Sequence, residues 1–157
     1  MLFRSRPLPG DQQMLAHLDI SCNGITALPE QFGLAVCWSL KHLNVSNNRI
    51  TQLPQGLLHL RQLTELLYSS NGLLDSSLQP FGDLSQYWPN LNTLDLSFNE
   101  LRNVHFLPNA LGGFSPHVMR ALKLEGNGIR FLSASILEGP CGGILGALKD
   151  RMSLNRN

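Results

Sequence analysis

The stretch of sequence that decides the fold runs from Leu40 to Leu63 and reads LKHLNVSNNRITQLPQGLLHLRQL. Its opening follows the frame L-x-x-L-x-L-x-x-N-x-L, in which other aliphatic residues also fill the leucine positions. The same frame returns as LAHLDISCNGI, LTELLYSSNGL, LNTLDLSFNEL and MRALKLEGNGI, which begin at Leu15, Leu63, Leu91 and Met119. Five matches at spacings of 23 to 28 residues indicate an internal repeat.

Alternation within each repeat predicts a short strand. In the first repeat the expected strand covers residues 17–21, with Leu18 and Ile20 facing the core and the residues beside them facing outward. One repeat cannot bury its own apolar side, but stacked repeats bury it together as a parallel sheet. The innermost position is leucine in every repeat, at Leu18, Leu43, Leu66, Leu94 and Leu122.

One core position departs from the pattern. Tyr68 stands where the other repeats carry Ile20, Val45, Leu96 and Leu124. A buried tyrosine needs a hydrogen-bond partner for its hydroxyl. We therefore expect a locally adapted core around Tyr68.

These motifs strongly resemble the leucine-rich repeat family from Leu15 to about Leu132. The resemblance implies an α/β fold, a right-handed solenoid of about five repeats with a curved parallel sheet on its concave face. It also implies that inserts near 75–86 and 105–116 lie on the convex side. The asparagine of each repeat is expected to turn inward and satisfy backbone groups at the strand end, at Asn23, Asn48, Asn71, Asn99 and Asn127.

The sequence outside the repeats predicts two end segments: a lead-in or truncated cap over 1–14, and a breaker with a capping helix over 133–157. One helical stripe carries the apolar residues Ile144, Leu145, Leu148 and Met152. This segment weakly resembles the helix that follows the repeats in Roco proteins, which include the leucine-rich repeat kinases, at Gly143, Ile144, Leu145, Leu148, Lys149 and Arg151. The alternative reading is therefore a regulatory repeat fragment, cut from a larger multidomain GTPase or kinase.

Composition narrows the class of protein. A net charge of +1 with no basic run disfavours a nucleic-acid partner, and no stretch is long and apolar enough for membrane insertion. The start of the chain, residues 1–14, lacks the apolar core of a secretory signal. Three scattered cysteines with no C-x-x-C pair, at Cys22, Cys37 and Cys141, favour neither disulfides nor zinc and suggest a reducing, cytoplasmic setting.

The outward strand positions are the predicted partner-binding surface, because the family normally binds proteins on its concave face. They are His17, Asp19, Ser21, His42, Asn44, Ser46, Glu65, Leu67, Ser69, Thr93, Asp95, Ser97, Ala121, Lys123 and Glu125, with Phe98 just past its strand. Leu67 and Phe98 are apolar among polar neighbours, as in the centre of an interface. The alternative is that the inserts of the third and fourth repeats cover both residues.

Other site chemistries find less support. His17 and His42 fall at equivalent positions near Asp19, which suggests a metal site or a pH-sensitive patch, but a third convergent ligand is missing and a solvated pair is favoured. Nucleotide-binding and kinase motifs are absent, as is any nucleophile elbow. We therefore predict no enzyme activity, cofactor or metal. The glycosylation sequon at Asn44 would be used only in a secreted receptor ectodomain, a third reading.

The predicted function is a protein–protein interaction module, an intracellular scaffold or signalling adaptor whose partner the sequence leaves open.

Overall fold

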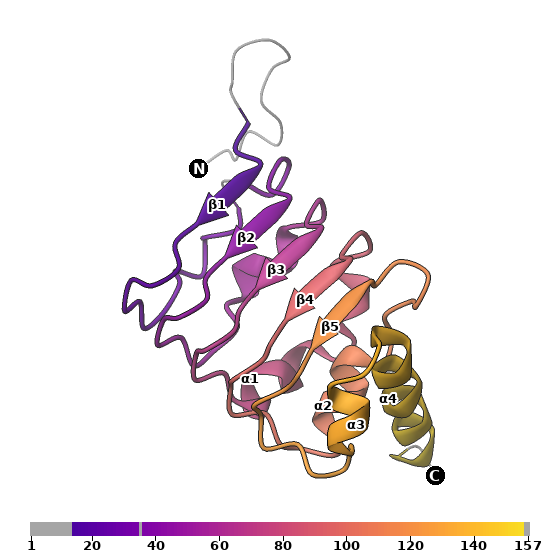
Figure 1. Cartoon of the computed structure of the whole chain (residues 1–157). Helices are drawn as coiled ribbons and strands as arrows, with labels where there is room; N and C mark the ends of the chain where they lie inside the picture. The colour runs from indigo at the N-terminus through magenta and orange to yellow at the C-terminus, as the bar shows by residue number, and fades with distance from the viewer. Residues whose placement is uncertain (1–13, 35, 156–157) are drawn as a thin grey trace.

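The computed structural model describes residues 14–34 and 36–155 and is a solenoid with one five-stranded parallel sheet (Figure 1). The strands lie side by side in chain order, so each repeat pairs only with its neighbours. Their bounds are β1 His17–Asp19, β2 His42–Asn44, β3 Glu65–Leu67, β4 Thr93–Asp95 and β5 Ala121–Lys123. The predicted fold class is confirmed.

The register of the sheet places equivalent residues of the repeats beside one another. Leu18 pairs with Leu43, and the row continues through Leu66, Leu94 and Leu122. The strands are three residues long, shorter than the five residues expected. The backbone ladder nevertheless continues past them, since the N–H of Ile20 donates to the carbonyl of Asn44 at 2.9 Å and that of Cys22 to Ser46 at 3.0 Å.

Short helical segments close the other side of the core, and the longer α4 lies beside β5 at the end of the sheet (Figure 1). They are η1 Gln55–His59, α1 Asp75–Leu78, η2 Gln79–Phe81, η3 Leu84–Gln86 and α2 Phe106–Leu111, followed by α3 Ala134–Leu137 and α4 Cys141–Asn155. The inserts near 75–86 and 105–116 supply four of these elements, and their apolar residues join the core under the sheet. Their predicted place opposite the concave face is confirmed.

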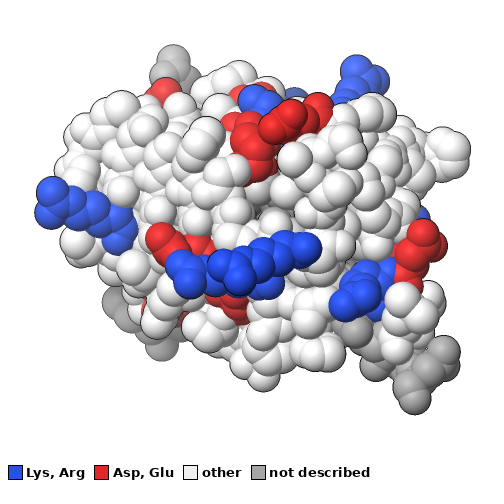
Figure 2. Space-filling model, turned by 60° about the horizontal axis from the view of Figure 1, so that its bottom comes forward, with Lys and Arg blue, Asp and Glu red and all other residues white. Residues whose placement is uncertain are grey.

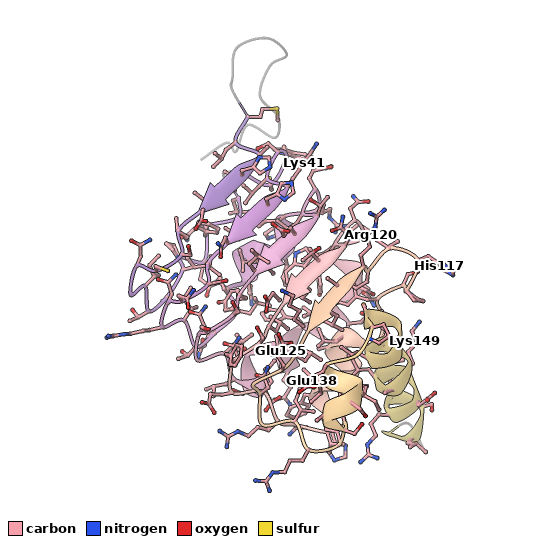
Figure 3. The ribbon with its side chains drawn as sticks, viewed as in Figure 1. Lys41, His117, Arg120, Glu125, Glu138 and Lys149 are labelled. Carbon is pink, nitrogen blue, oxygen red and sulfur yellow. The ribbon has the colours of Figure 1, made fainter. Side chains whose placement is uncertain are left out.

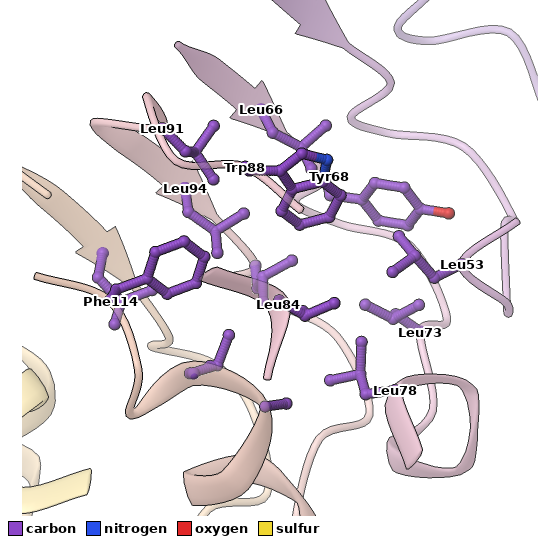
Figure 4. Packing of buried hydrophobic residues seen from close by; sticks show 14 of the residues in the cluster. Leu53, Leu66, Tyr68, Leu73, Leu78, Leu84, Trp88, Leu91, Leu94 and Phe114 are labelled. Atoms are coloured by element: carbon purple, nitrogen blue, oxygen red, sulfur yellow. The ribbon is translucent and has the colours of Figure 1, made fainter. Parts of the chain in front are cut away.

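Tyr68 and Trp88 are the largest fully buried side chains (Figure 4). The hydroxyl of Tyr68 donates to the carbonyl of Gln52 at 2.9 Å, and Trp88 Nε1 donates to the carbonyl of Leu57 at 2.9 Å. Burial raises the pKa of Tyr68 well above its ordinary value. The expected hydrogen-bond partner of Tyr68 is therefore present.

The asparagines form a ladder that ties each repeat to the one before it. Asn48 Nδ2 donates to the carbonyl of Ile20 at 3.0 Å and to that of Val45 at 2.8 Å, while its Oδ1 accepts from the N–H of Ile25 at 2.9 Å. The same pattern recurs around Asn71, Asn99 and Asn127. The predicted structural role is confirmed at these four positions, whereas Asn23, predicted to turn inward as well, is exposed.

The residue before each of these asparagines has left-handed backbone geometry. Its φ is positive in all five repeats, at Cys22 (58°), Asn47 (55°), Ser70 (51°), Phe98 (53°) and Gly126 (71°). Glycine adopts this conformation freely, asparagine tolerates it, and a bulky side chain strains it. Cys22 is thus one of five equivalent turn residues.

Helix α4 packs against α2 and β5 and covers the last repeat. The predicted helical stripe faces the core, with Ile144, Leu145 and Leu148 buried and Met152 partly buried. The first repeat differs, because Leu15 is 44% exposed, and Leu18, Ile20 and Ile25 are only partly buried. The lead-in expected over 1–14 lies outside the described residues except for Met14.

Candidate partner-binding surface

The sheet brings the predicted surface residues together in three rows. The first row runs His17, His42, Glu65, Thr93, Ala121, and the second runs Asp19, Asn44, Leu67, Asp95, Lys123. The third row lies two residues further along each repeat. It holds Ser21, Ser46, Ser69, Ser97 and Glu125. Residues from five separate repeats thus share one face.

The first row contains a stacked pair of imidazoles. The rings of His17 and His42 lie 4.1 Å apart between centroids with an interplanar angle of 6°, and His42 Nδ1 is 3.6 Å from Glu65 Oε1. A metal ion lies in the plane of each imidazole that binds it, and two parallel stacked rings cannot share such a point. In the described part of the chain, no group of three His, Cys, Asp or Glu side chains could hold a metal. The metal alternative therefore lacks support.

The second row is held by polar contacts on both sides of Leu67. Asn44 Nδ2 donates to Asp19 Oδ2 at 3.0 Å, and Lys123 Nζ lies 3.5 Å from Asp95 Oδ2. Hydrogen bonds from the hydroxyl and backbone N–H of Ser21 hold the pKa of the Asp19 carboxyl below its ordinary value. Asp19 therefore presents a negative charge over the whole physiological range.

Part of the predicted surface is inaccessible. Ser46 is 6% exposed, Asp95 9% and Ser97 3%. Asp95 Oδ1 accepts from the hydroxyl of Ser97 at 2.5 Å and from its backbone N–H at 3.0 Å, so the two residues satisfy each other. The expectation that these three residues present polar surface is wrong, because neighbouring strands crowd them. Leu67 is likewise half-buried and not freely exposed.

Phe98 is the prominent apolar residue of this face. Its side chain is 58% exposed, at a backbone position with φ of 53°. The ring lies over Gly126 of the next repeat, where an added Cβ would come within 2.3 Å of the Phe98 ring. The convex inserts do not cover it, so the alternative reading of a covered residue is wrong for Phe98.

Charge is spread thinly along this part of the sheet. Lys41 and Arg120 stand before β2 and β5 at the strand starts, whereas Glu125 follows the end of β5 (Figure 3). The N–H of Phe98 donates to the backbone carbonyl of Glu125 at 2.8 Å, so the backbones of these two residues lie side by side.

Sequence reasoning missed two further features. Trp38, on the connection into β2, is 56% exposed. The side chain of Arg102 lies over Gly128, as the ring of Phe98 lies over Gly126. An added Cβ at Gly128 would come within 2.7 Å of Arg102 Cγ. The signal for this second contact was present in the repeat frame, where the glycines flanking Asn127 stand opposite two long side chains of the preceding repeat.

Comparisons with known proteins agree with the geometry. Family models described as leucine rich repeat match residues 13–73 and residues 90–114. No curated protein matches the chain. Among the helices of the described residues, none is long and apolar enough to span a bilayer. The repeats, their frame and the parallel sheet lead to one assignment: the chain belongs to the leucine-rich repeat family.

Proposed function

We propose that this chain is a protein-binding module that receives its partner on the concave sheet. The observation that carries the proposal is Phe98, a mostly exposed aromatic side chain held in strained left-handed geometry next to the sheet. Strained, exposed positions are concentrated at binding sites, and aromatic anchors dominate interface energies.

The rows around Phe98 are suited to binding without rearrangement. Asp19 and Asn44, and Asp95 and Lys123, already contact each other across the strands. A surface fixed in this way loses little conformational entropy when a partner docks. Affinity then depends on how well the partner encloses Phe98.

The first experiment replaces Phe98 by a photo-crosslinking phenylalanine analogue and identifies the proteins that it captures. The matched control carries the same analogue at Leu154, which is 63% exposed on α4, away from the sheet. We expect a partner that is captured from Phe98 and not from Leu154.

The second experiment measures that partner's affinity for purified variants. Phe98→Ala and Leu67→Ala are expected to weaken binding by about 1 kcal/mol or more, roughly fivefold, with the larger effect at Phe98. Thermal unfolding controls for the half-buried Leu67. Unchanged affinity in both variants would overturn this placement of the partner.

Within this proposal the chain is a scaffold or signalling adaptor in a reducing, cytoplasmic compartment. Its three cysteines carry free thiols. Asn44, the acceptor of the glycosylation sequon, is half-buried and its amide is engaged with Asp19 and with the N–H of Ser46. A glycan is attached to Nδ2, the atom that donates to Asp19, and would crowd that contact, which favours this setting over a secreted ectodomain.

A second candidate function is a regulatory repeat segment of a Roco-type GTPase or kinase. The specific observation in its favour is that α4 forms over the residues that resemble the post-repeat helix of that group. Reading the gene beyond Asn157 tests it: a P-loop between a strand and a helix would favour this candidate.

A further inference from the structure

A groove of about 760 Å³ lies at the junction of the last three repeats and α4, apart from the three rows of the concave sheet. It is lined by Asp75, Arg102, Gly128, Arg130, Phe131 and Arg151, with two neighbouring residues. Figure 2, in which the bottom of Figure 1 comes forward, shows basic side chains lying beside acidic ones on this face. Three arginines against one carboxylate make the lining basic.

The acidic residues near the groove are already engaged. The Asp75 carboxylate accepts the backbone N–H groups of Arg102 at 2.9 Å and Asn103 at 3.0 Å. Glu100 forms an ion pair with Arg102. Arg130 is exposed and forms no ion pair with any described carboxylate. The groove therefore keeps an uncompensated positive charge.

Arg151 is the least satisfied of the three arginines. Its Nε is buried and has no hydrogen-bond partner among the described residues. Its guanidinium carbon lies 6.0 Å from the centre of the Phe131 ring, within cation–π range. Because water cannot reach the buried Nε, the donors that Arg151 offers to the groove are the terminal N–H groups of its guanidinium.

Arg102 is also held at the groove and is not a loose surface residue. Its aliphatic stem crosses Gly128, and any side chain at Gly128 would push that stem away. The arginines reach the groove from three segments of the chain: the loop after β4, the loop after β5, and α4. Convergence of separate elements on one space is typical of a binding site.

We propose that this groove binds a phosphorylated serine or threonine side chain of a protein partner. Guanidinium groups match phosphate geometry through paired N–H donors, and these charge-assisted bonds are about twice as strong as neutral ones. A dianion would use the free charge of Arg130 and accept hydrogen bonds from the terminal N–H groups of Arg151. The site is independent of Phe98, so it does not depend on the concave face being the principal docking surface.

The test titrates the protein with the acetylated, amidated pentapeptide Gly-Gly-phosphoSer-Gly-Gly at low salt. Binding is followed through the NMR signals of the arginine Nε–H groups. The same peptide with unmodified Ser or with Glu, and inorganic phosphate, are titrated in parallel. We expect the phosphopeptide to bind tightest and to shift the signals of Arg130 and Arg151.

Variants assign the groove. Arg130→Gln and Arg151→Gln should each weaken phosphopeptide binding at least several-fold, and Arg151→Lys should not restore it, because lysine cannot form the paired contact. The matched controls are Arg120→Gln, which removes an exposed arginine outside the groove, and Phe98→Ala; both should bind normally. Thermal unfolding verifies that each variant is folded.

Three results would overturn the proposal. Equal binding of the unmodified and phosphorylated peptides would show that phosphate is not recognised. An equal loss in Arg120→Gln would indicate non-specific charge attraction, which salt screens. Equal binding of inorganic phosphate would assign the groove to the free anion and not to a peptide side chain.

Discussion

The first and last repeats carry the same sequence frame but differ in how well they are buried. Leu122 of the last repeat is 3% exposed, whereas Leu18, its equivalent in the first repeat, is only partly buried. The difference lies in their neighbours: α4 packs against β5, and no described element covers the outer side of β1. The depth of burial in a solenoid is therefore set by stacking and not by the motif alone.

The comparison extends to the polar ladder. Asn99 is 5% exposed and bonds to backbone groups of two repeats, including the carbonyl of Tyr68 at 3.0 Å and the N–H of Leu73 at 3.0 Å. Asn23 is exposed, and its Nδ2 donates only to carbonyls of its own repeat, at Ile20 and Ser21. Apolar burial and hydrogen bonding thus weaken together toward the first repeat.

The largest expected effect compares equivalent leucines. Leu94→Ala, in a fully buried position, should lower the free energy of unfolding by about 3–5 kcal/mol, because it leaves a cavity that rigid neighbours cannot fill. Leu18→Ala should cost only about 1 kcal/mol, since partly buried side chains lose less transfer energy. Urea denaturation measures both changes. Equal losses would show that an element outside the described residues buries the first repeat.

Asparagines provide the second, smaller contrast. Asn99→Ala should cost roughly 2–3 kcal/mol, because it leaves buried backbone donors and acceptors without partners. The same substitution at Asn23 should cost under about 1 kcal/mol, since water can replace its exposed contacts. Amide hydrogen exchange at Leu73, whose N–H donates to Asn99 Oδ1, should accelerate in the first variant. Unaltered protection there would contradict the assigned role of the ladder.

The repeat frame was sufficient to predict the sheet, its register and the role of the asparagines. These features follow from the spacing of leucines and from the need of buried polar groups for partners. Strand length was overestimated, because outward alternation continues in sequence after regular pairing has ended.

The surface was harder to predict, because accessibility depends on cross-strand neighbours. Asp95 and Ser97 alternate outward as expected, yet they bond to each other and lie beneath the side chains around them. The groove formed by Arg102, Arg130 and Arg151 unites segments that are distant in the sequence, and no local pattern encodes their meeting. The frame could have indicated only the two contacts of Phe98 and Arg102 with their facing glycines, Gly126 and Gly128.

The smallest contrast concerns two glycines with similar backbone geometry near opposite ends. Gly24 has φ of 68° with open space around its missing Cβ, and Gly126 has φ of 71° under the Phe98 ring. Alanine costs roughly 1–2 kcal/mol in the left-handed region, so Gly24→Ala should lose about that much stability. Gly126→Ala should lose the same amount of stability. It should also lose a further amount, because the added methyl group displaces the Phe98 ring.

The double variant Phe98→Ala with Gly126→Ala separates the two causes. Removing the ring should cancel the extra loss at Gly126 and leave only the backbone penalty, so the two substitutions should be non-additive by an amount equal to that extra loss. Phe98→Ala with Gly24→Ala is the control and should be additive, since no contact joins the Gly24 site to the ring. Additivity in both pairs would show that the exposed ring moves aside freely, and would weaken the case for Phe98 as a rigid anchor.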